Sequence, residues 1–233
     1  FNLNDGEVTT LINSEQFIGL NEDGSILLKN NNLHIEIVCD HEKSLHKSGI
    51  FDVILESAIT TIVDFEDSAS TVTHDEKIHA YRNYLGLMKG NLSAKFNKGG
   101  ETLTRSLNSD KKYKDSSGKK FSLSGTSLTL VRNVGIHMFS DLVINKDGSS
   151  VPEGILDAMI TSLIALHDLK IKGNSKTGSF YIVKPKLHGP EEVQFTMKLF
   201  SLVEKALSLK ENTLKIGVMD EERRTSINLM SCI

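Results

Sequence analysis

The sequence lacks the features that mark membrane-spanning, secreted and disulfide-stabilised proteins. It has no run of about 18 uninterrupted apolar residues, the length that a membrane-spanning helix needs. Its first ten residues, FNLNDGEVTT, have neither the basic start nor the apolar core of a signal peptide. The only two cysteines, Cys39 and Cys232, form no CxxC motif. These absences predict a cytoplasmic protein without a membrane span and argue against a zinc site.

A strong charge of one sign is also missing. The 27 basic and 30 acidic residues give a formal net charge of −3 at pH 7, with a pI of about 6.3. Bulk positive charge is what drives non-specific binding to nucleic acid, so nucleic acid is not an expected partner. Hydrophobic residues make up 39% and charged residues 24% of the 233 residues, which is typical of a soluble globular protein.

Two regions differ in pattern from the rest of the chain. Up to about residue 58, short apolar runs at 16–20, 25–29 and 33–39 are separated by the turn sequences NEDG and NNN, which predicts a meander of three strands. Residues 93–126 are polar, basic and rich in glycine and serine. We interpret them as an insertion that contains a hairpin around SSGK.

Elsewhere from residue 60 onward, strands and helices alternate. Short apolar runs predict strands at 60–65, 127–131, 179–184 and 214–219. Apolar residues three or four apart predict helices at 73–90, 152–170 and 190–207. This alternation, with continuous apolar strands, predicts an α/β fold in which helices cover a parallel sheet.

Capping signals mark the ends of two of these helices. Thr73 and Glu76 have the spacing of a capping box, and Gly90 lies where a glycine commonly follows a helix. Pro152 is expected at the first helical position of the next helix, which carries an apolar stripe through Ile155 and Leu163.

Ionisable residues follow every predicted parallel strand. The first strand leads into DFEDS, the second leads into RNVGIH with Arg132, the third leads into Lys184, Lys186 and His188, and the fourth leads into DEERR. Active sites of α/β barrels and open α/β sheets form at this carboxyl edge. Two convergent carboxylate clusters suit Mg²⁺, and an arginine between them can hold a carboxylate or a developing oxyanion. The pattern indicates a Mg²⁺-dependent barrel enzyme that acts on a small oxo- or carboxylate substrate through an enolate.

Simpler interpretations exist for the same residues. Asp67 and Asp75 are also what the start of a helix favours, because carboxylates there complement the helix dipole. The DEERR segment has the composition of a solvated run of paired charges. His188 precedes Gly-Pro, and we favour a role in ordering that turn.

Six long segments carry a family resemblance. They are TTIVDFEDSASTVTHDEKIHAYRNYLGLMKGNL, TLTRSLN, LVRNVGIHM, VPEGILDAMITSLIALHDLK, GSFYIVKPKLHGPEEVQFT and TLKIGVMDEERRTSINL. They resemble the malate synthases, specifically the long monomeric isoform G, from about residue 52 to the end. The resemblance implies a TIM-barrel enzyme that condenses acetyl-CoA with glyoxylate and water to give malate and CoA, using Mg²⁺. It also implies barrel segments at 59–92 and 127–233, with 1–58 and 93–126 in an α/β domain inserted beside the barrel.

The resemblance implies roles for individual residues. Arg132 matches the arginine that contacts glyoxylate and stabilises the enolate of acetyl-CoA. Glu221 matches the Mg²⁺-binding glutamate beside glyoxylate, with Glu222 as the alternative if the register differs by one.

Four more positions match the family. Asp64 and Glu66 match the acidic pair beside the metal, which we expect to hold its water ligands. Ser68 and Arg105 match positions that contact acetyl-CoA.

Two parts of the family's active site have no match within the chain. The second Mg²⁺ carboxylate, in a GFLD segment, and the catalytic aspartate would lie beyond Ile233. The resemblance implies a monomeric parent protein. Because these parts are missing, we expect the 233-residue chain to be inactive and self-associated. Two other interpretations remain: a citrate-lyase-like Mg²⁺-dependent acyl-CoA lyase, and a non-catalytic truncated module.

Overall fold

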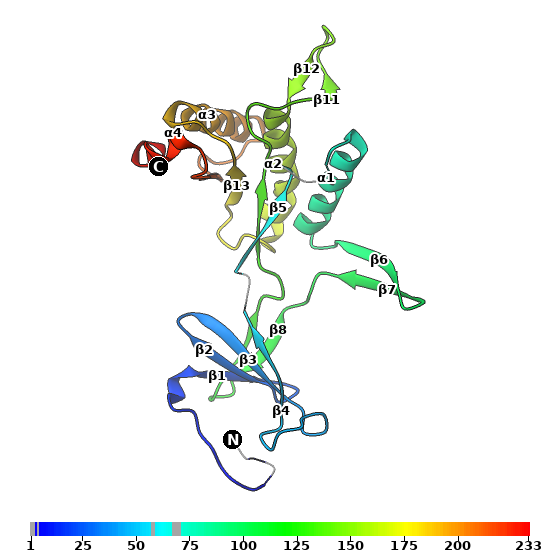
Figure 1. The fold of residues 1–233 in the computed structure, drawn as a ribbon, viewed down its shortest axis with the longest axis vertical. Coiled ribbons are helices and arrows are strands. Elements are labelled where there is room, and N and C mark those ends of the chain that lie inside the picture. Colours follow the sequence, from blue (N-terminus) through cyan, green and yellow to red (C-terminus); the bar gives the residue numbers. More distant parts are fainter. Residues whose placement is uncertain (1–2, 4, 57–58, 67–70) are drawn as a thin grey trace. The chain divides into compact units, whose positions relative to one another are not determined.

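The computed structural model describes residues 3, 5–56, 59–66 and 71–233, and the chain divides into two compact units. The first comprises Phe1–Ile59 and Asn108–Ser127, and the second comprises Thr60–Leu107 and Leu128–Ile233. Figure 1 shows the elements of each unit in sequence colours. Assigning these units to a barrel and an inserted α/β domain remains a prediction.

The described part of the first unit is built on an antiparallel sheet of six strands, in the order β4-β3-β2-β1-β8-β9. The strands are β1 (Phe17–Asn21), β2 (Ile26–Asn30), β3 (Leu33–Cys39), β4 (Ile50–Leu55), β8 (Lys111–Lys114) and β9 (Lys120–Leu123), and a short 3₁₀ helix, η1 (Ser14–Gln16), precedes them. The predicted meander is confirmed as β1–β2–β3. The hairpin around SSGK is confirmed as β8–β9.

The second unit contains a parallel sheet of four strands. They are β5 (Thr60–Asp64), β10 (Leu128–Arg132), β13 (Phe180–Lys184) and β14 (Leu214–Val218), in the order β14-β13-β10-β5. All three neighbouring pairs are parallel, which confirms the predicted sheet. Neighbours in space follow one another along the chain, as in a TIM barrel, whereas a doubly wound sheet reverses its strand order at a switch point.

Three long helices pack side by side in this unit. They are α1 (His74–Met88), α2 (Glu153–Ile171) and α3 (Pro190–Ala206), and two short helices follow, α4 (Arg223–Ser226) and α5 (Leu229–Cys232). Helix α1 packs on α2, and α2 packs on α3. None of the helices in the described ranges is long and apolar enough to cross a membrane.

The capping signals are confirmed for α1 and wrong by one position for α2. Both hydrogen bonds of the Thr73–Glu76 capping box are present, and Gly90 follows the helix with a φ of +70°. Pro152 caps α2 from outside instead of occupying its first turn, because it is still paired with Phe139 as the last residue of a strand.

Two further hairpins belong to the second unit. One is formed by β6 (Ser93–Lys98) and β7 (Glu101–Ser106), and the other by β11 (Phe139–Ile144) and β12 (Ser150–Pro152). The hairpin β6–β7 follows α1 and is mostly exposed to solvent.

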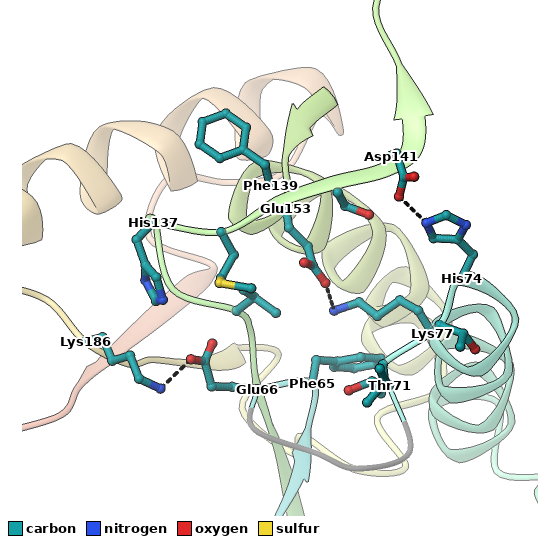
Figure 2. Close-up of a pocket in the computed structure, with 15 residues that line it drawn as sticks. Phe65, Glu66, Thr71, His74, Lys77, His137, Phe139, Asp141, Glu153 and Lys186 are labelled. Carbon is teal, nitrogen blue, oxygen red and sulfur yellow. Dashed lines mark hydrogen bonds and ion pairs between the residues drawn. The ribbon is translucent and has the colours of Figure 1, made fainter. Parts of the chain in front are cut away.

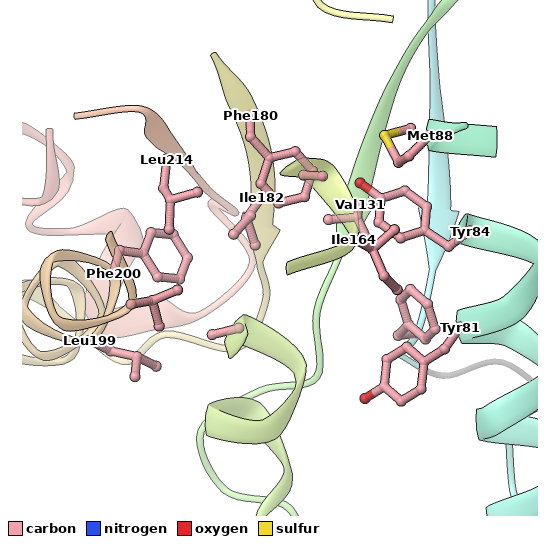
Figure 3. Packing of buried hydrophobic residues seen from close by; sticks show 14 residues of the cluster. Tyr81, Tyr84, Met88, Val131, Ile164, Phe180, Ile182, Leu199, Phe200 and Leu214 are labelled. Carbon is pink, nitrogen blue, oxygen red and sulfur yellow. The ribbon is translucent and has the colours of Figure 1, made fainter. Parts of the chain in front are cut away.

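The core of the second unit lies between the parallel sheet and the helices (Figure 3). Val131 and Ile182 come from the strands, and Tyr84 and Phe200 come from α1 and α3. Burial of each such side chain typically stabilises a fold by about 1.5–3 kcal/mol.

Helix α2 buries small and polar side chains instead of its apolar stripe. Ile155 is 40% and Leu163 is 51% exposed, whereas Ala158, Thr161 and Ser162 are fully buried. The small residues allow the helix to lie close to the sheet.

Candidate active site at the carboxyl edge of the parallel sheet

The four parallel strands end at one edge, and each delivers an ionisable residue there. Asp64 ends β5 and Arg132 ends β10, and these two residues are register partners in neighbouring strands. Lys186 follows β13, and Glu221 follows β14. Because parallel strands place their carboxyl ends together, groups far apart in sequence meet at this edge.

Arg132 is held by Asp64 through a two-point ion pair. Its Nε lies 2.8 Å from Asp64 Oδ1, and its Nη2 lies 2.5 Å from Asp64 Oδ2. Nη2 also lies 3.4 Å from the backbone oxygen of Glu66, and Nη1 lies 3.9 Å from the sulfur of Met219. A fork of this kind fixes the plane of the guanidinium as well as its position. Val131, the preceding residue, faces the helices, so Arg132 faces the opposite side of the sheet.

A second chain of contacts links the four loops at this edge. The carboxylate of Glu66 is buried, and its Oε1 lies 2.5 Å from Lys186 Nζ. Its Oε2 accepts a hydrogen bond of 2.7 Å from the backbone N–H of Gly135. The backbone N–H of Lys186 donates to Oε1 of Glu221 at 2.7 Å. Lys186 therefore joins the acidic segment after β5 to the one after β14.

A pocket of about 420 Å³ opens beside this chain of contacts. Glu66 and Lys186 line one part of it, and the ion pair between Lys77 and Glu153, 2.8 Å apart, lines another (Figure 2). The remaining wall residues are Phe65, Thr71, Val72, Thr73, His74, Val134, His137, Met138, Phe139, Ser140 and Asp141. The pocket thus offers both charged and apolar surface to a ligand.

Buried charges lie beneath the segment that follows Arg132. Asp157, on α2, is fully buried and accepts hydrogen bonds from Tyr81, Val134 and Lys77. Burial, with the nearby Asp157 carboxylate as the next cause, raises the pKa of the Tyr81 hydroxyl well above its usual range. Burial also lowers the pKa of Lys184 to about 8.

Glu221 is the residue of this edge best suited to hold a divalent cation. Asp64 and Glu66 are both engaged in ion pairs, whereas Glu221 uses one carboxylate oxygen for a backbone N–H. In the part of the chain that the structure describes, no group of three or more His, Cys, Asp or Glu side chains converges. Mg²⁺ fits such a setting, because it takes one or two carboxylates and fills its remaining positions with water and substrate oxygens.

The two neighbouring glutamates point to different partners. Glu221 contacts Lys186, whereas Oε2 of Glu222 lies 3.6 Å from Nε2 of His188, whose backbone N–H donates to Glu192. Only Glu221 joins the chain of contacts that includes Glu66.

Among the residues that the structure describes, four of the predicted site residues lie together and Arg105 lies apart from them. The four at the carboxyl edge are Arg132, Asp64, Glu66 and Glu221. Arg105 lies on β7 with its guanidinium 4.8 Å from the centre of the Phe96 ring, and no hydrogen bond or ion pair joins it to the described residues of the edge. Ser68 lies outside the described residues.

Sequence reasoning missed the buried residues Lys77 and Asp157 and the partly buried Glu153. The available signal was the spacing of Glu153 and Asp157, one turn apart on a helix that is otherwise largely apolar. The position of Lys77 on the facing helix is decided by tertiary packing.

Comparison with known proteins adds to this geometry. Residues 128–233 match the family described as malate synthase, TIM barrel domain. Over 99% of its length the chain is 50% identical to malate synthase G of Halalkalibacterium halodurans, of which it covers 33%. It is 46% identical to malate synthase G of Corynebacterium efficiens and 43% identical to that of Corynebacterium glutamicum, in both cases over 100% of its own length and about one third of theirs. The chain therefore spans about one third of the length of these curated relatives.

Proposed function

Since this chain belongs to the malate synthase family, we propose that it supplies part of the active site of an enzyme that condenses acetyl-CoA with glyoxylate and water to give malate and CoA. The observation that carries the proposal is the two-point pair between Arg132 and Asp64, at the edge where Glu221 also lies. This edge of the sheet carries both a fixed cation and a carboxylate that could bind a metal, as the resemblance requires.

Arg132 is the residue that we assign to the reacting groups. Removing a proton from the methyl group of acetyl-CoA places negative charge on the thioester oxygen. A guanidinium that Asp64 already holds in place stabilises that charge without reorganising, an effect worth about 3–4 kcal/mol in a dry site. The same guanidinium can also bind the carboxylate of glyoxylate.

Glu221 would bind Mg²⁺, and Asp64 and Glu66 would hold water molecules of its coordination shell. When bound, Mg²⁺ polarises the aldehyde of glyoxylate as a Lewis acid. Lys186 orients Glu221 through its backbone N–H and neutralises Glu66 through its ammonium.

For acetyl-CoA, we assign binding to Ser68 and Arg105. A guanidinium suits a phosphate of CoA, because it can donate two parallel hydrogen bonds. We further propose that the parent enzyme is a cytoplasmic monomer.

A chimera tests this function. The 233 residues replace the matching third of the Halalkalibacterium halodurans malate synthase G, and thiol release is measured with acetyl-CoA, glyoxylate and Mg²⁺. Thiol release that depends on glyoxylate is the expected result. A folded chimera that instead breaks the carbon–carbon bond of malyl-CoA to give acetyl-CoA and glyoxylate, with no thiol release, would favour the acyl-CoA lyase.

A further inference from the structure

The backbone of Val134, two residues after Arg132, is held by two buried charged side chains. One contacts its N–H group and the other contacts its carbonyl oxygen. Its N–H donates to Oδ2 of Asp157 at 2.8 Å, and its carbonyl oxygen accepts a hydrogen bond from Nζ of Lys184. Neither Asp157 nor Lys184 is exposed to solvent. The next peptide N–H, that of Gly135, donates to Glu66. One short segment therefore connects Arg132 to the carboxylate that contacts Lys186.

The two groups that hold this peptide are themselves fixed. Oδ1 of Asp157 lies 2.5 Å from the hydroxyl of Tyr81 and 3.0 Å from Nζ of Lys77. Lys77 also pairs with Glu153 at 2.8 Å. Removing such charges from water costs several kcal/mol per ion, and a fold stabilised by packing alone would have apolar side chains here. The charges lie directly beneath the segment that follows Arg132.

The packing around the Val134 peptide leaves no room for it to shift toward α2. A Cβ atom on Gly154, in the first turn of α2, would lie 2.7 Å from Nζ of Lys184 and 2.9 Å from the carbonyl oxygen of Gly135. Real Cβ atoms do not approach other atoms that closely, so a glycine is needed at this position.

We propose that Asp157 and Lys184 are positioning residues of the active site, which clamp the Val134 peptide and thereby set the place of Arg132 and of the contact between Gly135 and Glu66. The clamp is a property of the structure, and only its effect on turnover rests on the proposed function. Lys184 lies on the helix-facing side of β13, away from the face that carries Arg132, so it acts through the backbone and does not touch substrate.

The charges around Lys184 are compatible with a lasting clamp. Burial lowers the pKa of Lys184 to about 8, Asp157 and Glu66 oppose that shift, and Lys77 adds to it. Both the protonated and the neutral amine carry N–H groups, so the hydrogen bond to Val134 survives in either state.

The first test needs no activity. In the chimera, Lys184→Met removes the donor and keeps an unbranched side chain that is only one atom shorter. Hydrogen–deuterium exchange read by mass spectrometry should show amide exchange in the 130–136 peptide at least ten times faster than in the parent. The control variant is Lys215→Met, which changes an exposed lysine of β14 and should leave this peptide within twofold of the parent. Unchanged exchange in Lys184→Met would overturn the clamp.

The second test asks whether the clamp acts through Arg132. We expect Lys184→Met to lower kcat at least tenfold, with the KM for acetyl-CoA within twofold of the parent. In an Arg132→Lys background, the same change should lower kcat less than twofold further, because the group that it positions is already lost. A full tenfold loss in both backgrounds would show a general structural role and refute the proposal.

Gly154→Ala provides an independent perturbation in case Lys184→Met does not fold. It keeps every charge and crowds Nζ of Lys184, so it should accelerate exchange in the 130–136 peptide and lower kcat in the same direction. A chimera without any turnover, but with faster exchange in these variants, would contradict the proposed function and leave the clamp standing. Parent-like exchange and kcat in both variants would overturn the clamp alone.

Discussion

Arg132→Lys tests whether the fixed guanidinium contributes to turnover. The substitution keeps one positive charge at the end of β10 and removes the planar fork. In the structure, Nε of that fork lies 2.8 Å from Oδ1 of Asp64, and Nη2 lies 2.5 Å from Oδ2. An ammonium can make one of these contacts and cannot fix the plane in which the other donors lie.

The expected loss in kcat is about 100-fold to 1,000-fold, equivalent to about 2.7–4 kcal/mol, which is the cost of losing one oxyanion donor. The effect on folding should be much smaller. The side chain of Asp64 is 37% exposed, so water replaces the lost contact and the free energy of unfolding should fall by about 1 kcal/mol or less.

The assay is thiol release from acetyl-CoA with saturating glyoxylate and Mg²⁺ in the chimera, alongside urea unfolding. Arg82→Lys is the matched control, because it makes the same chemical change at an exposed position on α1. Turnover of Arg132→Lys within threefold of the parent would remove Arg132 from the mechanism.

Three further outcomes are expected. Glu221→Gln should raise the Mg²⁺ concentration for half-maximal activity at least tenfold, because a neutral amide replaces an anionic ligand, and an unchanged value would point to Glu222 or another ligand. The folded-state pKa of Lys184 is about 8 and its ordinary value is 10.5, so the unfolded chain binds more protons between these two pH values. The free energy of unfolding should therefore rise with pH in that window, by up to about 3 kcal/mol relative to Lys184→Met in urea unfolding. Parallel pH curves for the two proteins would contradict this. The 233-residue chain on its own should release no thiol and should scatter light as an oligomer. The reason for the association is that β4 and α3 expose large apolar side chains, among them Phe51 (52% exposed) and Met197 (55% exposed). A monomer with measurable turnover would refute this expectation.

Local sequence was sufficient to predict the four parallel strands and the three long helices of the second unit, but not β4 or the hairpins β6–β7 and β11–β12. The four parallel strands are continuous apolar runs, and the helices follow from residues three or four apart. The ends of α1 were predictable because a capping box and a following glycine involve only neighbouring residues. The placement of Arg132 at the end of a strand also followed from the sequence, since the strand itself is evident.

Tertiary structure alone decided how these residues are paired. Asp64 and Arg132 lie 68 residues apart, and the register between β5 and β10 makes them partners. Lys184 and Lys186 are equally charged and only two residues apart, yet one is buried against Val134 and the other contacts Glu66. The buried face of α2 could not be predicted from its apolar stripe, because the facing helix and loop require small side chains and charged partners there. Spacing along a chain determines local conformation, whereas burial and pairing depend on which distant segments the fold brings together.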